Sequence, residues 1–176
     1  FKNPYEESKY EAERCVVHSD LPWTIYRPSI ILGESVSGLC DGQTVYNVAK
    51  MLRLAQKAGA RQALAQPQVE TPRFRVVVDQ GAAKNLIHVD DVVCRMLLIA
   101  AHPPEPGTCF HITHDVPTPM TDLIAVIAAL LDIPEYEAVQ TLEGAPLSAA
   151  ETALERISGV FRPYMLTSDA RFETGH

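Results

Sequence analysis

The chain has 176 residues, of which 47% are hydrophobic and 21% are charged. That length allows one domain with a real core, and the composition is ordinary for a soluble globular protein. The formal net charge of -7, without any basic run, argues against a nucleic-acid-binding surface.

The cysteines and the hydropathy of the chain indicate in which cellular compartment the protein should be found. The four cysteines are far apart and form no CxxC pair, at Cys15, Cys40, Cys94 and Cys109. They predict neither a disulfide framework nor a zinc site, and favour a reduced, cytoplasmic protein. The longest apolar run, Ile124–Leu131, is too short to span a bilayer, and no signal peptide is visible. Because the chain begins with Phe1 and a helix follows almost at once, we expect a piece of a longer chain.

The first predicted helix begins at Asn3, a good N-cap, with Pro4 at its first position and Glu6 at capping-box spacing. It should end near Ser19. Its notable feature is a Tyr and a Lys, Tyr5 and Lys9, at positions i and i+4, which lie one above the other on a helix face. A phenol titrates near ~10, and a neighbouring cation favours its ionised form. Such a pair can move a proton to or from a substrate oxygen, although the spacing alone is common in helices.

The rest of the chain alternates short β-prone runs with helical patterns. In chain order we expect a strand over 23–27, a turn at Pro28, an irregular loop over 34–42, a helix over 43–58 ended by Gly59, a polar loop over 62–72 and a strand over 74–79. Next comes a short strand from Asn85 that leads into a buried helix, which is capped near Asp90 and ends near Ala101. A strand over 109–113 and a helix from Thr118 follow. The last two expected elements are a strand over 137–142 and a helix over 148–157 with a Ser148–Glu151 capping box. Helices alternating with strands predict a parallel α/β arrangement.

Two histidine groups invite a metal interpretation, which the pattern does not favour. His111 and His114 lie in or beside a predicted strand, where alternating side chains would place them on opposite faces. His88 precedes Asp90 and Asp91, which are better explained as the start of a helix. We therefore predict no metal site.

Three segments together carry a resemblance: Asn3–Lys9, Arg27–Gly33 and Leu86–Val93. In this order and spacing they resemble the extended short-chain dehydrogenase/reductase family, over residues 1–135. The resemblance implies the C-terminal part of a doubly wound, Rossmann-like parallel sheet plus a small mixed α/β substrate-binding lobe. It assigns 1–33 and 74–102 to the Rossmann-like part, and mainly 34–73 and 103–176 to the lobe.

The resemblance also implies a role for each matching residue. Tyr5 would be the general acid/base toward the substrate oxygen, and Lys9 would favour its phenolate and hydrogen-bond the nicotinamide ribose. The residues that would line the nicotinamide pocket of bound NADP or NAD are Pro28, Ser29 and Ile30. The residues expected on the substrate side are Gly33, Lys84 and His88.

Two parts of the family pattern are missing from this chain. The Gly-rich βα turn that cradles the cofactor pyrophosphate has no match among the nine glycines, and the catalytic Ser or Thr would lie upstream of Phe1. We therefore expect this chain alone to bind dinucleotide weakly or not at all. We expect Tyr5 and Lys9 to act in catalysis only in the longer protein. Tight one-to-one NADPH binding in calorimetry would contradict this expectation.

Three functions remain open. The loop after Gly33 and the tail Phe161–Phe172 look more like those of the thioester and fatty-acyl reductases, which act on free or carrier-bound acyl substrates. A nucleotide-sugar epimerase or dehydratase is the first alternative, although Lys84 stands where many of these have a phosphate-binding Arg. The second is a non-catalytic binding module. By analogy with the family, the Tyr5 helix could form a homodimer interface, and the chain could belong to a multidomain protein.

Overall fold

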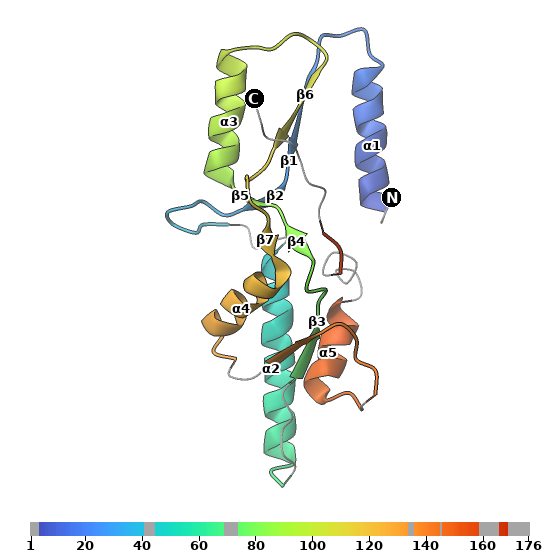
Figure 1. Cartoon of the computed structure of the whole chain (residues 1–176), viewed down its shortest axis with the longest axis vertical. Coiled ribbons are helices and arrows are strands. Elements are labelled where there is room, and N and C mark those ends of the chain that lie inside the picture. The colour runs from blue at the N-terminus through green and yellow to red at the C-terminus, as the bar shows by residue number, and fades with distance from the viewer. Residues whose placement is uncertain are drawn as a thin grey trace. The chain divides into compact units, whose positions relative to one another are not determined.

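The computed structural model describes residues 4–40, 45–68, 74–133, 136–144, 146–158 and 166–168 (Figure 1). The capping expected at Asn3 and the family-like tail from Phe161 lie outside these residues, apart from 166–168. The chain forms two compact units. The first holds the described residues of Phe1–Leu39 and Leu86–Asp115, and the second those of Cys40–Asn85 and Val116–Arg171. In this division residues 74–85 belong to the second unit, and residues 34–39 and 103–115 belong to the first.

The first unit is a parallel α/β arrangement, as the fold class predicted. Its elements are α1 (Pro4–Val17), β1 (Thr24–Pro28), β2 (Ile30–Leu32), β5 (Leu86–His88), α3 (Val89–Ala101) and β6 (Thr108–Ile112). Strand β1 pairs with β6 in parallel, and β2 pairs with β5 in parallel. Parallel strands joined through helices are the mark of Rossmann-like folds.

The two faces of the β1–β6 pair differ in polarity. On the α3 side, Ile87, Val92 and Ile112 form a small buried cluster, against which Tyr26 and Met96 pack. On the other side stands α1, which has no buried residue (Figure 1). The expectation that α3 is buried all round is wrong. Its described neighbours cover one side only, so the opposite side stays in solvent, with Val93, Leu97 and Leu98 exposed.

Several boundaries in the first unit differ from expectation. Pro28 does not end the strand in a turn: it is the last residue of β1, and β2 follows after Ser29. A proline at a strand end lacks only a donor that the ladder does not need there. The N-cap of α3 is His88, and Asp90 lies inside the first turn. The carboxylate of Asp90 accepts hydrogen bonds from Ser35 instead.

The second unit is a mixed α/β lobe built around a long helix. Its elements are α2 (Tyr46–Ala65), β3 (Phe74–Val77), β4 (Ala83–Lys84), β7 (Thr118–Pro119), α4 (Met120–Leu130), β8 (Tyr136–Val139) and α5 (Ala149–Ser158). Strands β3 and β8 are parallel, and β4 and β7 are antiparallel. Thr118 and Pro119, expected to begin a helix, form β7, and the helix begins at Met120. The core joins α2, α4, α5 and β3 through side chains such as Leu52, Val76, Ile124 and Leu154.

Gly59 does not end α2, which continues to Ala65 through part of the expected polar loop. A Cβ at Gly59 would lie 3.5 Å from the Cβ of Ala150 in α5. The glycine therefore marks a close approach between two helices. Packing against α5 stabilises the helix beyond the point where local propensity would end it.

Packing of the lobe core can be tested at α4. Ile124 is 1% exposed, so Ile124→Val should lower the free energy of unfolding by about 1 kcal/mol, through lost burial and a small cavity. Val126 on the same helix is 58% exposed, and Val126→Ala should have little effect. Chemical denaturation of both variants checks this, and equal losses would contradict the assigned core.

Two further searches gave negative results for the described residues. None of their helices combines the length and apolarity that a membrane crossing requires. Nowhere among them do three or more His, Cys, Asp or Glu side chains gather as metal ligands.

Candidate functional site

Tyr5 and Lys9 lie together on α1, as the i, i+4 spacing predicts. The Lys9 ammonium nitrogen is 5.4 Å from the centroid of the Tyr5 ring, within the range of a cation–π contact. Tyr5 is 66% exposed, and Lys9 is also exposed. The two side chains therefore neither point apart nor lie sealed in an apolar core, and both are accessible to a ligand.

One helical turn further along α1, Glu13 forms an ion pair with Arg27 of β1. Both guanidinium nitrogens Nε and Nη2 donate to the carboxylate, and Nε lies 2.9 Å from Oε2. The hydrogen bond from Arg27 lowers the pKa of Glu13, with a smaller contribution from His111, while the same bond raises the pKa of Arg27. Glu13 is therefore ionised at neutral pH and joins α1 to the strand that leads to Pro28 and Ser29.

Ser29 and Thr113 follow the carboxyl ends of β1 and β6, the edge at which parallel sheets bind ligands. The Ser29 N–H donates to the carbonyl of Ile112 at 3.0 Å, which brings the two chain segments together. The hydroxyl oxygens of Ser29 and Thr113 are both buried, and neither has a hydrogen-bond partner among the described residues. Buried hydroxyls are almost always paired, so these two oxygens are exceptions to that rule at the ligand-binding edge of a parallel sheet.

His88 and Gly33, both predicted on the substrate side, contact each other. His88 Nδ1 lies 2.9 Å from the Gly33 carbonyl oxygen, to which it donates. Next to it, Asp90 accepts from the Ser35 N–H at 2.9 Å and from the Ser35 hydroxyl at 2.7 Å. These bonds from Ser35 lower the pKa of Asp90. Together they attach the loop after β2 to the start of α3.

The attachment of this loop gives a prediction. Asp90→Ala removes both acceptors for Ser35, so the loop over 34–40 should be cleaved faster in limited proteolysis. Asp91→Ala is the matched control, since Asp91 is an exposed acid next to Asp90 in the first turn of the same helix. Equal cleavage rates in the two variants would show that Asp90 does not hold the loop.

The remaining predicted residues are placed differently. Pro28 is exposed at the end of β1, while Ile30 is half-buried in β2. Lys84 belongs to the second unit, in β4, and is 3% exposed. The structure thus brings Tyr5 to Lys9 and Gly33 to His88, and joins the first pair to Ser29 only through Glu13 and Arg27.

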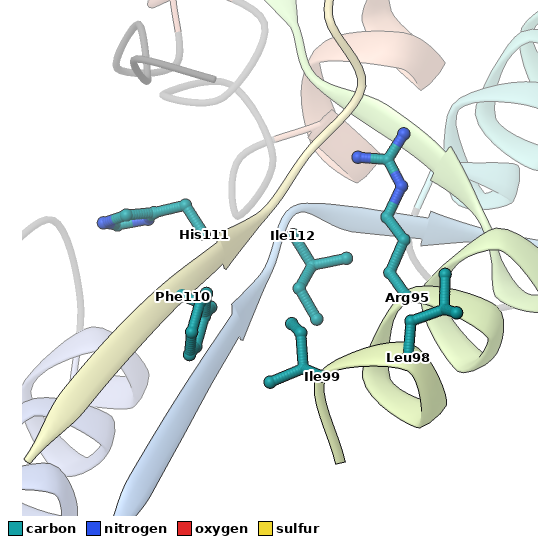
Figure 2. A pocket seen from close by; sticks show the side chains of 6 residues that line it. All are labelled: Arg95, Leu98, Ile99, Phe110, His111 and Ile112. Carbon is teal, nitrogen blue, oxygen red and sulfur yellow. The ribbon is translucent and has the colours of Figure 1, made fainter. Parts of the chain in front are cut away.

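A separate shallow cavity of about 250 Å³ lies between α3 and β6 (Figure 2). It is lined by Arg95, Leu98, Ile99, Phe110, His111 and Ile112. Arg95 Nη1 donates to the Thr113 carbonyl at 2.7 Å, whereas the His111 ring points away from α3 (Figure 2). None of the predicted site residues lines this cavity.

Sequence analysis did not identify Glu13, Arg27, Ser35 or Thr113 as site residues. A local signal existed for Glu13, which follows Lys9 by the same four-residue step that links Tyr5 to Lys9. Arg27 lay inside a motif but had no stated role. Ser35 and Thr113 carried no signal, because their significance depends on contacts between distant segments.

Comparison with known proteins agrees with the motif resemblance. A family model described as Male sterility protein matches residues 1–96, more than half of the 176-residue chain. None of the curated proteins matches the chain.

Alignments with several solved structures extend over most of this chain. RMD from Pseudomonas aeruginosa complexed with NADPH is 23% identical, with a TM-score of 0.48, over 89% of this chain and 50% of its own. The terminal R domain from the myxalamid PKS-NRPS biosynthetic pathway is 16% identical, with a TM-score of 0.48, over 94% of this chain and 52% of its own. The dTDP-glucose 4,6-dehydratase of Bacillus anthracis in complex with NAD is 16% identical, with a TM-score of 0.48, over 91% of this chain and 46% of its own.

The chain thus spans about half the length of the solved structures that it matches. The family match covers α1 with Tyr5 and Lys9, the Arg27–Gly33 segment and the strand-to-helix segment at His88. The chain therefore belongs to the NAD-binding family described as Male sterility protein.

Proposed function

We propose that the full-length protein is an NAD(P)H-dependent reductase that acts on the carbonyl, aldehyde or thioester of an acyl substrate, free or carrier-bound. The observation that carries the proposal is the Tyr5–Lys9 pair, whose ammonium and ring lie 5.4 Å apart on an exposed face of α1. An accessible phenol beside a fixed cation is suited to deliver a proton to an oxygen on which negative charge develops.

Each residue has a distinct task in this proposal. Tyr5 holds the proton and donates it to the substrate oxygen, and Lys9 stabilises the phenolate that remains. The Ser29 hydroxyl, buried and without a partner among the described residues, hydrogen-bonds the amide of the nicotinamide. Pro28 and Ile30 border the same pocket, and the nicotinamide, when bound, supplies the hydride. Of the two nicotinamide cofactors, NADP is the one favoured in this proposal.

The acyl substrate is favoured over a nucleotide sugar for two reasons. The matching family model lies on the acyl-reductase side of the superfamily. In addition, Lys84 stands where many epimerases and dehydratases have an arginine, and it lacks the bidentate fork that binds a diphosphate well. On the substrate side, His88 supports the backbone of Gly33 and fixes the start of the loop after β2.

The full-length protein should be mixed with NADPH or NADH and three substrate panels: acyl thioesters, long-chain aldehydes and nucleotide sugars. Loss of reduced-nicotinamide absorbance with thioesters or aldehydes is the expected result. Conversion of nucleotide sugars alone would favour the epimerase or dehydratase. Tight NADPH binding without turnover in any panel would indicate the non-catalytic module.

A further inference from the structure

We propose that the Glu13–Arg27 ion pair fixes the register of α1 along β1 and so places Lys9 beside Ser29. We call this ion pair the clamp. Neither residue contacts substrate in this proposal; both act through the residues that do. The inference rests on the proposed function for its catalytic consequence, but the geometry itself can be tested without catalysis.

The clamp follows from simple distances along the two elements. In Figure 1, α1 runs antiparallel to β1, so moving backward along the helix corresponds to moving forward along the strand. Lys9 precedes Glu13 by one turn, ~6 Å along a helix. Ser29 follows Arg27 by two residues, ~7 Å along a strand. With Glu13 bound to Arg27, Lys9 therefore lies level with Ser29, and Tyr5 one further turn along.

The same face of the sheet carries the neighbouring groups. Ser29 lies just after β1, but its N–H donates to the Ile112 carbonyl at 3.0 Å and so continues the ladder by one residue. Side chains two apart in such a ladder point to the same face, so Ser29 shares the face of Arg27. In the register of β1 with β6, His111 lies beside Arg27, and its ring points away from α3 (Figure 2). The contribution of His111 to the ionisation of Glu13 agrees with this placement. Thr113 follows His111 by two residues, and the hydrogen bond from Ser29 to Ile112 brings it next to Ser29; its hydroxyl has no hydrogen-bond partner among the described residues.

Apolar packing does not fix α1 in this way. The helix has no buried residue, and even Val16 and Val17 remain more than 40% exposed, at 43% and 41%. An amphipathic helix is normally held in rotation and register by its apolar stripe. Among the described residues, the bidentate Arg27–Glu13 ion pair, whose geometry is strict, fixes the rotation and register of α1 instead.

The energetic expectation separates positioning from stability. The side chains of Arg27 and Glu13 are 46% and 27% exposed, so solvent screens the pair and its contribution to folding is small. Its contribution to catalysis is larger, because a small misplacement of reacting groups can cost up to about 100-fold in rate. Breaking the pair should therefore reduce turnover while leaving the melting temperature nearly unchanged.

The kinetic test uses the full-length protein with four variants. They are Glu13→Gln, Arg27→Gln, the charge-swapped Glu13→Arg/Arg27→Glu and, as control, Glu11→Gln, which removes the exposed pair with Arg14 on the same helix. Both single variants at the clamp should lower kcat by about 10- to 100-fold, with KM and melting temperature little changed. The charge swap should recover most of the lost kcat, and Glu11→Gln should behave as the wild type.

The geometric test needs no activity. In the full-length protein with its native cysteines replaced by serine, the exposed positions Lys9 and His111, the latter beside Arg27, are changed to cysteine and joined by a short bismaleimide. Without further substitutions the two cysteines should be cross-linked rapidly. Adding Glu13→Gln should lower the cross-linking rate at least about fivefold, because the register of α1 on β1 is lost. Adding Glu11→Gln should leave the rate unchanged.

Three results would overturn the clamp: a wild-type linking rate with Glu13→Gln, a kcat loss that the charge swap leaves unrepaired, or a kcat loss that follows the loss of folded protein. Failure of the proposed function has a different signature. In that case Tyr5→Phe would retain wild-type turnover, and the linking rates would still decide the clamp.

Discussion

Tyr5→Phe in the full-length protein should lower kcat by about 100- to 10,000-fold, the range supplied by a positioned general acid. The substitution removes only the phenolic oxygen and keeps the ring beneath the Lys9 ammonium. Cofactor affinity should therefore stay close to the wild-type value. Initial rates with an acyl thioester, together with NADPH binding followed by fluorescence, measure the two quantities separately.

Tyr10 provides the matched control on the same helix. It is 49% exposed and also carries a cation over its ring, since the Arg14 guanidinium carbon lies 5.8 Å from the Tyr10 centroid. Tyr10→Phe should turn over like the wild type, because Tyr10 lies one residue beyond Lys9 and away from the stripe formed by Tyr5, Lys9 and Glu13. Unchanged turnover in Tyr5→Phe would remove Tyr5 from the mechanism, and a large loss in Tyr10→Phe would move the active face of α1.

Glu151→Ala should destabilise the lobe by about 3 kcal/mol, as expected when one partner of a buried ion pair is removed. Glu151 is 2% exposed and lies in the first turn of α5. Its carboxylate accepts from the Arg75 N–H at 2.9 Å, from Arg75 Nε at 2.7 Å and from the Ser148 N–H at 2.8 Å. One side chain thus connects β3 to α5 and also completes the capping box.

The same carboxylate makes stability depend on pH. Burial alone would raise the pKa of Glu151, but the hydrogen bonds from Arg75 and Ser148 outweigh it and lower the pKa from 4.5 to about 2. Because the folded pKa lies below the unfolded one, the stabilisation is complete above about pH 5 and is lost as the pH falls toward 2. That loss should amount to about 3 kcal/mol at most.

Thermal melts of the full-length protein between about pH 7 and pH 3 measure both effects. Glu143→Ala is the control, because Glu143 is an exposed acid of the same lobe. At neutral pH only Glu151→Ala should melt early. Toward pH 3 the wild type should approach the variant, since it loses the same interaction. A constant gap between the two across this range would show that the Glu151 carboxylate does not carry the pH dependence.

The sequence by itself determined the features that depend on near neighbours along the chain. A four-residue step on a helix was enough to place Lys9 over Tyr5, and the three-residue spacing of Ser148 and Glu151 was enough to predict their reciprocal hydrogen bonds, which lie at 2.8 and 3.2 Å. The alternation of β-prone and helical runs predicted the parallel α/β class. In each case the geometry is fixed within one helical turn or along one strand.

Only the tertiary structure decided the features that join distant segments. Local propensity ended a helix at Gly59 and assigned Asp90 to a cap. Packing against Ala150 carries α2 onward, and Ser35 takes the Asp90 carboxylate. No spacing rule links Glu13 to Arg27 across the intervening turn. Nor does any spacing rule predict that the hydroxyls of Ser29 and Thr113 find no hydrogen-bond partner in the described part of the chain. Such contacts depend on the path of the whole chain, because side chains far apart in sequence meet only after the strands have paired and the helices have packed.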